Sequence, residues 1–321
     1  MPALLPPDPP ISPTNRVMAD APNASWGAAL SALRARMDLP TGPWRRLPTG
    51  KNVVIELGEE AILKLIPPYW SEDAQREAEA LRLVPLDGPV AIPTLLALDM
   101  LDGWTVLLLR RLPGTILSEQ WPSLSGSQRA ELAAQLGAVA AWLHRVEVPP
   151  GSPLAYDWAA HIESEAEAAP QQLAQDGAPA ELQDSWPTFL RSVGPLPSPG
   201  SAPVLLHGDL SVANVLVRED TAGRWRVTGL LDFGDASLGE FTHDWLSPGV
   251  HNFGGDPAVV GAFCDGYGLP TSQRTSALQA HLLARSLLYY GWRYLRHKSP
   301  LQGATTWQEV ASIVWPIMVG A

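Results

Sequence analysis

The chain has 321 residues, of which 46% are hydrophobic and 17% charged, a balance typical of a folded globular protein that excludes an intrinsically disordered one. A net charge of −11 argues against nucleic acid as the main partner. The single cysteine, Cys264, excludes an internal disulfide, and no apolar run is long enough for a membrane span.

The N-terminal segment contains seven prolines in its first 24 residues and has no periodic apolar pattern, so we expect a flexible Pro-rich tail over 1–24. It lacks the basic start and the apolar run of a signal peptide, which favours a cytoplasmic location. Ser25 is a candidate N-cap for a short amphipathic helix that starts at Trp26.

Short β-rich runs follow between residues 44 and 67, and one of them, Ile62-Leu63-Lys64-Leu65-Ile66, carries a charge. Lys64 is one of only three lysines in the chain. An ammonium among apolar neighbours needs an anionic partner, because unpaired burial of charge is costly. Nucleotide phosphates would serve, with a carboxylate to hold the lysine. The alternative is that strand alternation exposes Lys64 to solvent.

A helix expected over 71–84 offers two carboxylates as partners for Lys64. Glu77 shares a helical face with apolar residues such as Leu81, whereas Glu79 shares its face with polar ones. We therefore pair Lys64 with Glu77.

Gly50 lies in the turn T-G-K-N between the first two of these strands. Backbone N–H groups in such a turn could cover nucleotide phosphates. The alternative is an ordinary hairpin glycine, since no G-x-G-x-x-G pattern is present.

The boundary between two lobes is expected where the apolar strand from Trp104 to Leu109 runs into Pro113-Gly114. A nucleotide-binding lobe would span 25–112, and a catalytic and substrate-binding lobe would span 113–321. Helices are expected in the second lobe over 126–146, 155–174, 182–193, 272–298 and 305–318. The element order predicts an α+β, bilobal, protein-kinase-like fold, with a small β-rich N-lobe and a larger, mostly helical C-lobe.

The helix expected over 155–174 is rich in acids. These residues suit either a cationic ligand or a solvated helix face. They are Asp157, Glu163, Glu165 and Glu167.

Two motifs carry the chemistry: L-H-G-D-L-S-V-A-N-V-L from Leu206, and L-D-F-G-D from Leu231. Asp209 and Asn214 keep the spacing of the kinase catalytic loop, and Asp232 follows another apolar strand. Such groups can provide a base for an acceptor hydroxyl and two oxygen ligands for Mg²⁺. The alternative is that Asp209 and Asn214 only build a turn.

Three further residues surround these motifs. His207 competes with Asp209 as the base, since imidazole titrates near neutral pH, but its spacing matches a structural histidine and we interpret it as an organiser. Asp244 is expected to hold the loop to the core by hydrogen bonds. Asp235 could be a third carboxylate near the metal, and we interpret it as an ordinary loop acid.

The segments H-G-D-L-S-V-A-N-V-L-V, L-L-D-F-G-D-A-S-L-G-E and H-D-W resemble the aminoglycoside phosphotransferase family, which includes choline kinase-like small-molecule kinases. The resemblance covers about residues 44–245. It implies transfer of the terminal phosphate of ATP or GTP to a hydroxyl of a small molecule. Glu240-Phe241 departs from the family pattern, which commonly has Asp followed by Pro; that position is interpreted as structural.

The resemblance also implies roles for the candidate residues. Asp209 would be the catalytic base, Asn214 and Asp232 would hold Mg²⁺, and Lys64 with Glu77 would position the phosphates. The expected partners are a nucleoside triphosphate, ATP or GTP, and a small hydroxylated substrate, without nucleic acid or membrane. A nucleotide-binding regulatory pseudokinase and a protein kinase are the rival functions. The presence of the four kinase residues favours an enzyme, and the absence of an A-P-E segment favours a small substrate.

Overall fold

The computed structural model describes residues 3–6, 26–47, 52–196, 202–298, 301 and 303–317. By its internal contacts the chain divides into two compact units. Unit 1 consists of Met1–Leu86, Ala91–Pro113 and Leu231–Asp235. Unit 2 consists of Asp87–Val90, Gly114–Leu230 and Ala236–Ala321.

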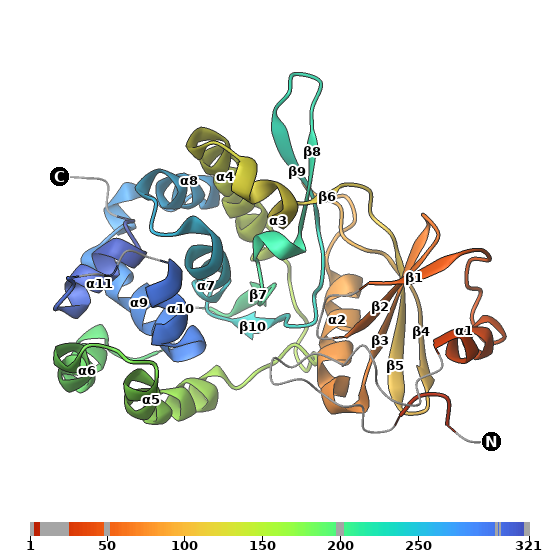
Figure 1. The fold of residues 1–321 in the computed structure, drawn as a ribbon, viewed down its shortest axis with the longest axis horizontal. Helices are drawn as coiled ribbons and strands as arrows, with labels where there is room; N and C mark the ends of the chain where they lie inside the picture. The colour runs from red at the N-terminus through yellow and green to blue at the C-terminus, as the bar shows by residue number, and fades with distance from the viewer. Residues whose placement is uncertain are drawn as a thin grey trace. The chain divides into compact units, whose positions relative to one another are not determined.

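Unit 1 is built on a five-stranded antiparallel sheet with the strand order β1-β2-β3-β5-β4. The strands are β1 (Trp44–Arg46), β2 (Val53–Leu57), β3 (Ala61–Ile66), β4 (Leu95–Leu101) and β5 (Trp104–Arg110). The helices are α1 (Trp26–Arg34) and α2 (Ser71–Leu83). Four consecutive residues of β5, 106–109, are buried, because this strand is paired on both edges and α2 packs against it and β4 (Figure 1).

Most elements predicted for this unit are confirmed: the helix at Trp26, the strands between 44 and 67, the helix over 71–84 and the strand from Trp104. Strand β4 was not predicted. Gly50 and Ser25 lie outside the described residues.

The segment 3–6 packs onto unit 1. The backbone N–H groups of Leu4 and Leu5 donate to Asp102 Oδ2 at 2.6 and 2.9 Å, and Trp104 Nε1 donates to the carbonyl oxygen of Pro6 at 2.8 Å. The side chain of Leu5 is buried. A flexible tail over 1–24 is therefore the wrong description of these residues, while 1–2 and 7–25 lie outside the described part of the chain.

Unit 2 is mostly helical. Its helices are α3 (Leu117–Gln120), α4 (Gly126–Leu143), α5 (Trp158–Gln175), α6 (Ala180–Val193), α7 (His243–Pro248), α8 (Pro257–Tyr267), α9 (Ser276–Tyr290), α10 (Trp292–Lys298) and α11 (Trp307–Val314). Its strands are β6 (Thr115–Ile116), β7 (Val204–Leu206), β8 (Val215–Glu219), β9 (Trp225–Leu230) and β10 (Ser237–Gly239). The β8–β9 hairpin extends β6, and β7 pairs with β10, which leaves the motif loop 207–214 between β7 and β8 (Figure 1).

Among the helices described in unit 2, α4 and α8 make the most extensive contact. Helix α4 starts at a capping box in which Ser125 and Gln128 satisfy each other's backbone N–H groups. Glycines at the contact let the two backbones approach: a Cβ added to Gly137 would lie 2.2 Å from the Phe263 carbonyl oxygen, and one added to Gly266 would lie 1.8 Å from that of Ala134.

The helix predicted over 272–298 is wrong as a single element. The chain forms α9 and α10 with a break at Gly291, whose φ is 78°. Asp176 Oδ2 then accepts a hydrogen bond from the Arg293 backbone N–H at 3.0 Å, which caps the start of α10. The other helices predicted in this unit are present, with ends that differ from the predicted ones by up to four residues. Among the described helices, none combines the length and apolar character that a bilayer crossing requires.

Candidate active site

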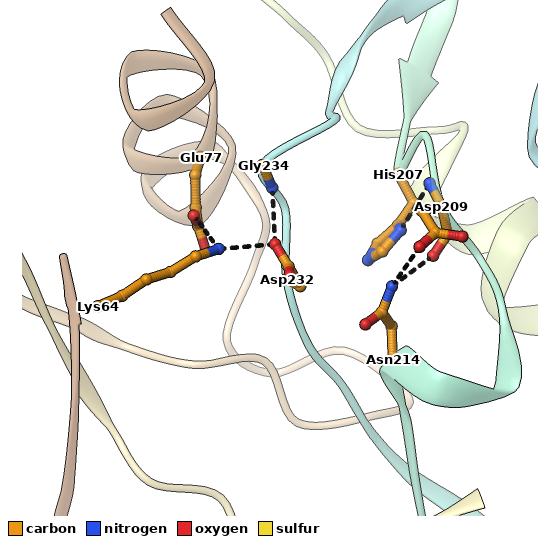
Figure 2. Close-up of polar contacts among 7 residues, drawn as sticks. All are labelled: Lys64, Glu77, His207, Asp209, Asn214, Asp232 and Gly234. Atoms are coloured by element: carbon orange, nitrogen blue, oxygen red, sulfur yellow. Dashed lines mark hydrogen bonds and ion pairs between the residues drawn. The ribbon is translucent and has the colours of Figure 1, made fainter. Parts of the chain in front are cut away.

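Unit 1 holds a buried lysine between two carboxylates. Lys64 Nζ, on β3, lies 2.6 Å from Glu77 Oε2, on α2, and 2.7 Å from Asp232 Oδ1 (Figure 2). Lys64 is 4% exposed and Glu77 is 1% exposed. The predicted pairing with Glu77 is thus observed, and the solvent-exposed alternative for Lys64 is wrong. Glu79 lies 3.9 Å from Arg82 instead.

The two carboxylates change the proton equilibria of this cluster. Burial disfavours the charge on Lys64, but the attraction of Asp232 and Glu77 outweighs it and raises the pKa of the lysine. Burial raises the pKa of Glu77 to about 7, although the attraction of Lys64 opposes this shift. Lys64 therefore stays protonated at neutral pH and presents a fixed positive charge.

Asp232 has an unusual backbone conformation. Its φ is 60°, and within the described chain only Asp102 shares a positive φ among the non-glycine residues. This conformation is uncommon for a residue with a Cβ, and such residues cluster at functional sites. Asp232 Oδ1 also accepts from the Gly234 backbone N–H at 3.3 Å (Figure 2), while half of the side chain, 51%, stays exposed.

The catalytic-loop motif lies in unit 2, where it orients the Asp209 carboxylate. Asn214 Nδ2 donates to Asp209 Oδ2 and to the Asp209 carbonyl oxygen, both at 2.9 Å (Figure 2). A 3-10 turn over Val212–Asn214 brings the asparagine back towards the aspartate. Ser247 Oγ, on α7, donates to Asp209 Oδ1 at 2.5 Å. Both carboxylate oxygens therefore have a defined partner.

Asp244 holds the backbone of this loop, as predicted. Its Oδ2 accepts from the His207 N–H at 2.9 Å, and its Oδ1 accepts from the Gly208 N–H at 2.8 Å. His144 Nε2 lies 3.0 Å from Asp244 Oδ2. Burial alone would raise the pKa of Asp244, but these hydrogen bonds outweigh it and lower that pKa, so the buried carboxylate stays ionised.

His207 is buried, and its Nδ1 accepts a hydrogen bond from the Asp209 backbone N–H at 3.3 Å (Figure 2). This contact ties the ring to the loop that carries Asp209. The interpretation of His207 as an organiser agrees with this geometry.

Asn214, in unit 2, and Asp232, in unit 1, each carry oxygen atoms of the kind that a hard cation binds. The Asn214 amide nitrogen is engaged by Asp209, which orients the amide with its carbonyl oxygen away from that carboxylate. Asp232 adds carboxylate oxygens from a half-exposed side chain. Mg²⁺ takes oxygen ligands, retains waters and is commonly bound by one or two protein groups together with phosphates. Each of the two side chains by itself is therefore a group that Mg²⁺ can take as a ligand.

Unit 2 also contains a pocket of about 390 Å³ between α5 and the α9–α10 junction, a size typical of small-molecule sites. Four aromatic side chains line it: Trp186, Tyr289, Tyr290 and Trp292. Glu165 lines it as well, whereas Glu163 and Glu167 are exposed and Asp157 caps α5. The acidic helix thus divides between one pocket residue and a solvated face. The Tyr289 ring lies 4.8 Å from that of His243, on α7, next to Asp244.

Two features of the site were not predicted: Ser247 and the aromatic pocket. A signal for Ser247 is present in the sequence, because it follows Asp244 by three residues and so shares a helical face with it. The aromatic residues of the pocket come from α6, α9 and α10. No local sequence pattern reports that contact.

Solved structures share this fold. The streptomycin–ATP ternary complex of APH(2")-IIa matches with a TM-score of 0.59 and 19% identity, over 88% of this chain and 97% of that one. The GDP complex of aminoglycoside 2'-phosphotransferase-IIIa matches with a TM-score of 0.61 and 18% identity, over 90% and 97%. The ADP-bound APH(2'')-Ib matches with a TM-score of 0.57 and 16% identity, over 91% and 99%. The predicted α+β kinase-like fold is confirmed.

The sequence itself matches a family model described as the phosphotransferase enzyme family. The match runs over residues 49–278, more than half of the chain, and includes Lys64, Glu77, Asp209 and Asp232. Since the fold and the family agree with the expected enzyme class, the chain belongs to the phosphotransferase enzyme family.

Proposed function

We propose that this phosphotransferase moves the terminal phosphate of ATP or GTP to a hydroxyl of a small molecule, with Asp209 as the catalytic base. The observation that carries the proposal is the fixed Asp209 carboxylate, held by Asn214 and Ser247 in a loop that Asp244 anchors. Phosphoryl transfer depends mainly on positioning and charge stabilisation, so a base held on both oxygens suits it.

Unit 1 supplies the nucleotide contacts in this proposal. The fixed positive charge of Lys64 would bind the phosphates, and Glu77 would hold the lysine through the 2.6 Å contact. Gly50, whose turn lies outside the described residues, would cover the phosphates. The region 25–112 would then act as the nucleotide-binding lobe and 113–321 as the catalytic and substrate-binding lobe. The structures of APH(2")-IIa and of 2'-phosphotransferase-IIIa contain ATP and GDP, which supports a nucleotide co-substrate of either base.

Asn214 and Asp232 would hold Mg²⁺. When bound, the cation would supply positive charge to the phosphate oxygens as the phosphoryl group leaves. The carboxylate of Asp209 would orient the acceptor hydroxyl and take its proton.

The acceptor would occupy the aromatic pocket between α5 and the α9–α10 junction. Its volume suits a small molecule, and Tyr289 connects its wall to His243 on α7, the helix that also holds Asp209. Its lining combines aromatic side chains with the carboxylate of Glu165 and the guanidinium of Arg293, which supports an acceptor with an apolar portion and polar groups. The proposed setting is cytoplasmic.

The test compares the parent with Asp209→Asn, which keeps the size and polarity of the side chain but cannot take a proton. Nucleotide binding by calorimetry should be almost unchanged. Turnover over a panel of aminoglycosides, amino alcohols, sugars and hydroxy amino acids should fall by about 10²–10⁴-fold. A parent that binds nucleotide but neither phosphorylates any acceptor nor hydrolyses ATP would support the regulatory pseudokinase instead. Transfer to a general protein substrate would support the protein kinase.

A further inference from the structure

The hydroxyl of Ser247 makes an unusual contact for a helical serine. Serines inside helices often donate to the carbonyl oxygen four residues earlier. In the described part of the chain four helical serines do so: Ser31, Ser185, Ser286 and Ser312. Ser247 instead donates to the Asp209 carboxylate, 38 residues away in sequence. The 2.5 Å separation is typical of a hydroxyl bound to an ionised carboxylate.

The donor side of this contact is buried. Ser247 is 1% exposed and Asp209 is half-buried, so little water reaches the hydroxyl. In a low-dielectric environment such a charge-assisted bond is strong and directional. It restricts the side-chain rotation of Asp209, which Asn214 alone would hold from the other oxygen.

Helix α7 attaches to the loop at two points on one face. Asp244 accepts from the backbone N–H groups of His207 and Gly208, and Ser247, three residues later, holds the side chain of Asp209. The first contact fixes the path of the loop backbone. The second fixes the carboxylate that projects from it.

We propose that Ser247 is a positioning residue for phosphoryl transfer, which sets the orientation of the Asp209 carboxylate towards the acceptor hydroxyl. The inference rests on the assignment of Asp209 as the base. With Ser247 and Asn214 each engaging one oxygen, the remaining lone pairs of the carboxylate point in defined directions. A small misplacement of a reacting group is enough to lower a rate about a hundredfold.

The experiment measures steady-state kinetics for the parent, Ser247→Ala and Ser247→Thr with the best acceptor of the panel. Ser247→Ala should lower kcat by about 10- to 100-fold and leave the KM for nucleotide unchanged, because the Lys64 cluster is untouched. Ser247→Thr retains the hydroxyl and should recover most of kcat. Ser286→Ala is the matched control, since Ser286 is equally buried but donates to the Leu282 carbonyl oxygen; it should keep kcat.

A double-mutant cycle separates positioning from a structural effect. In an Asp209→Asn background, Ser247→Ala should cause no further loss of kcat, because the oriented group is already gone. An equal loss in both backgrounds would show a purely structural role and overturn the inference. So would a Ser247→Ala enzyme with the kcat of the parent. If Asp209→Asn is inactive while Ser247→Ala is fully active, only the inference fails; if Asp209→Asn turns over like the parent, the proposed function fails with it.

Discussion

Lys64 is a buried cation with two acidic partners, and its charge is what the proposed nucleotide site requires. Lys64→Met keeps the length of the side chain and removes that charge. We expect turnover to fall by roughly a hundredfold or more, because the loss of a charged phosphate contact removes a few kcal/mol of transition-state stabilisation.

The measurement is kcat/KM for nucleotide, with Arg82→Met as a control that removes a half-exposed cation of the same region. The control should behave like the parent. Near-parent kinetics in Lys64→Met would exclude Lys64 from the nucleotide site.

His243 gives the fold a dependence on pH. Burial, followed by repulsion from Arg285, lowers the pKa of His243 from 6.5 to about 3, although the attraction of Asp244 and Glu240 opposes this shift. Below pH 6.5 His243 is protonated in the unfolded chain, whereas in the folded chain it stays neutral down to about pH 3. The contribution of His243 therefore makes the free energy of unfolding fall as the pH drops through that window.

This dependence can be measured by urea unfolding between pH 7.5 and pH 4.5. His243→Gln removes the titrating group and should flatten the decline, whereas His297→Gln, at an exposed position, should leave it unchanged. An identical decline in the parent and in His243→Gln would contradict the assignment.

Part of the site could be predicted residue by residue. Glu77 was identifiable because helical spacing put it on the apolar face of α2, and a buried lysine needs such a partner. Ser247 was not identified, since its acceptor is 38 residues away, and its spacing from Asp244 indicates a shared helical face but not the acceptor. Contacts between distant segments depend on how the loop and α7 pack, which local patterns do not encode.

At the scale of elements, the contact of α4 with α8 depends on glycines. An alanine at Gly137 would bring its Cβ to 2.2 Å from the Phe263 carbonyl oxygen, so the helices would have to separate. We expect Gly137→Ala to lower the free energy of unfolding by about 1–3 kcal/mol, as overpacked cores do.

The matched control is Gly261→Ala in α8, where an added Cβ meets nothing within 4 Å. That change should raise the free energy of unfolding by about 0.5–1 kcal/mol, because alanine loses less entropy in a helix than glycine. Urea titration of the three proteins distinguishes the two effects. Equal stability of Gly137→Ala and the parent would show that the contact between α4 and α8 does not depend on a glycine at position 137.

Elements were predictable where one face is apolar and the other polar. Strand β4 was missed because its exposed residues, Leu96, Leu98 and Met100, are apolar like most of those on its other face. Its sequence therefore lacks the alternation of apolar and polar residues that predicts a strand. The break between α9 and α10 was missed for a different reason. Apolar residues continue across Gly291, and only its positive φ, with Asp176 at the following helix start, ends the helix.

At the scale of the whole molecule, nucleotide binding should stabilise the fold and should need Mg²⁺. A ligand present at 100 times its Kd adds about 2.7 kcal/mol to the free energy of unfolding. Asp232→Ala should abolish the part of this stabilisation that depends on Mg²⁺, because the carboxylate is a proposed metal ligand.

Thermal melts with ATP, with and without Mg²⁺, provide the measurement. Asp235→Ala serves as the control and tests whether that neighbouring acid is an ordinary loop residue, in which case it keeps the full effect. Protection of Asp232→Ala equal to that of the parent would remove Asp232 from the metal site.

The sequence also predicted the general plan of the molecule, because β-rich and helical runs segregate along the chain. It predicted a single boundary near residue 112, whereas unit 1 comprises three segments, of which the second ends at Pro113. Two short segments belong to the unit opposite to their neighbours in sequence: Asp87–Val90 to unit 2 and Leu231–Asp235 to unit 1. Composition does not predict them, because they are defined by their contacts with residues distant in sequence.

The assignment of Leu231–Asp235 to unit 1 has a consequence for the gene. The codons for this pentapeptide lie among those of unit 2, so no single crossover separates the coding sequence of unit 1 from that of unit 2. A chimaera that takes everything before Pro113 from a relative would replace the residues around positions 64 and 77 but keep the native Asp232 that contacts Lys64. Recombination between relatives must therefore exchange residues 1–113 and 231–235 together, or use relatives in which the two segments already match.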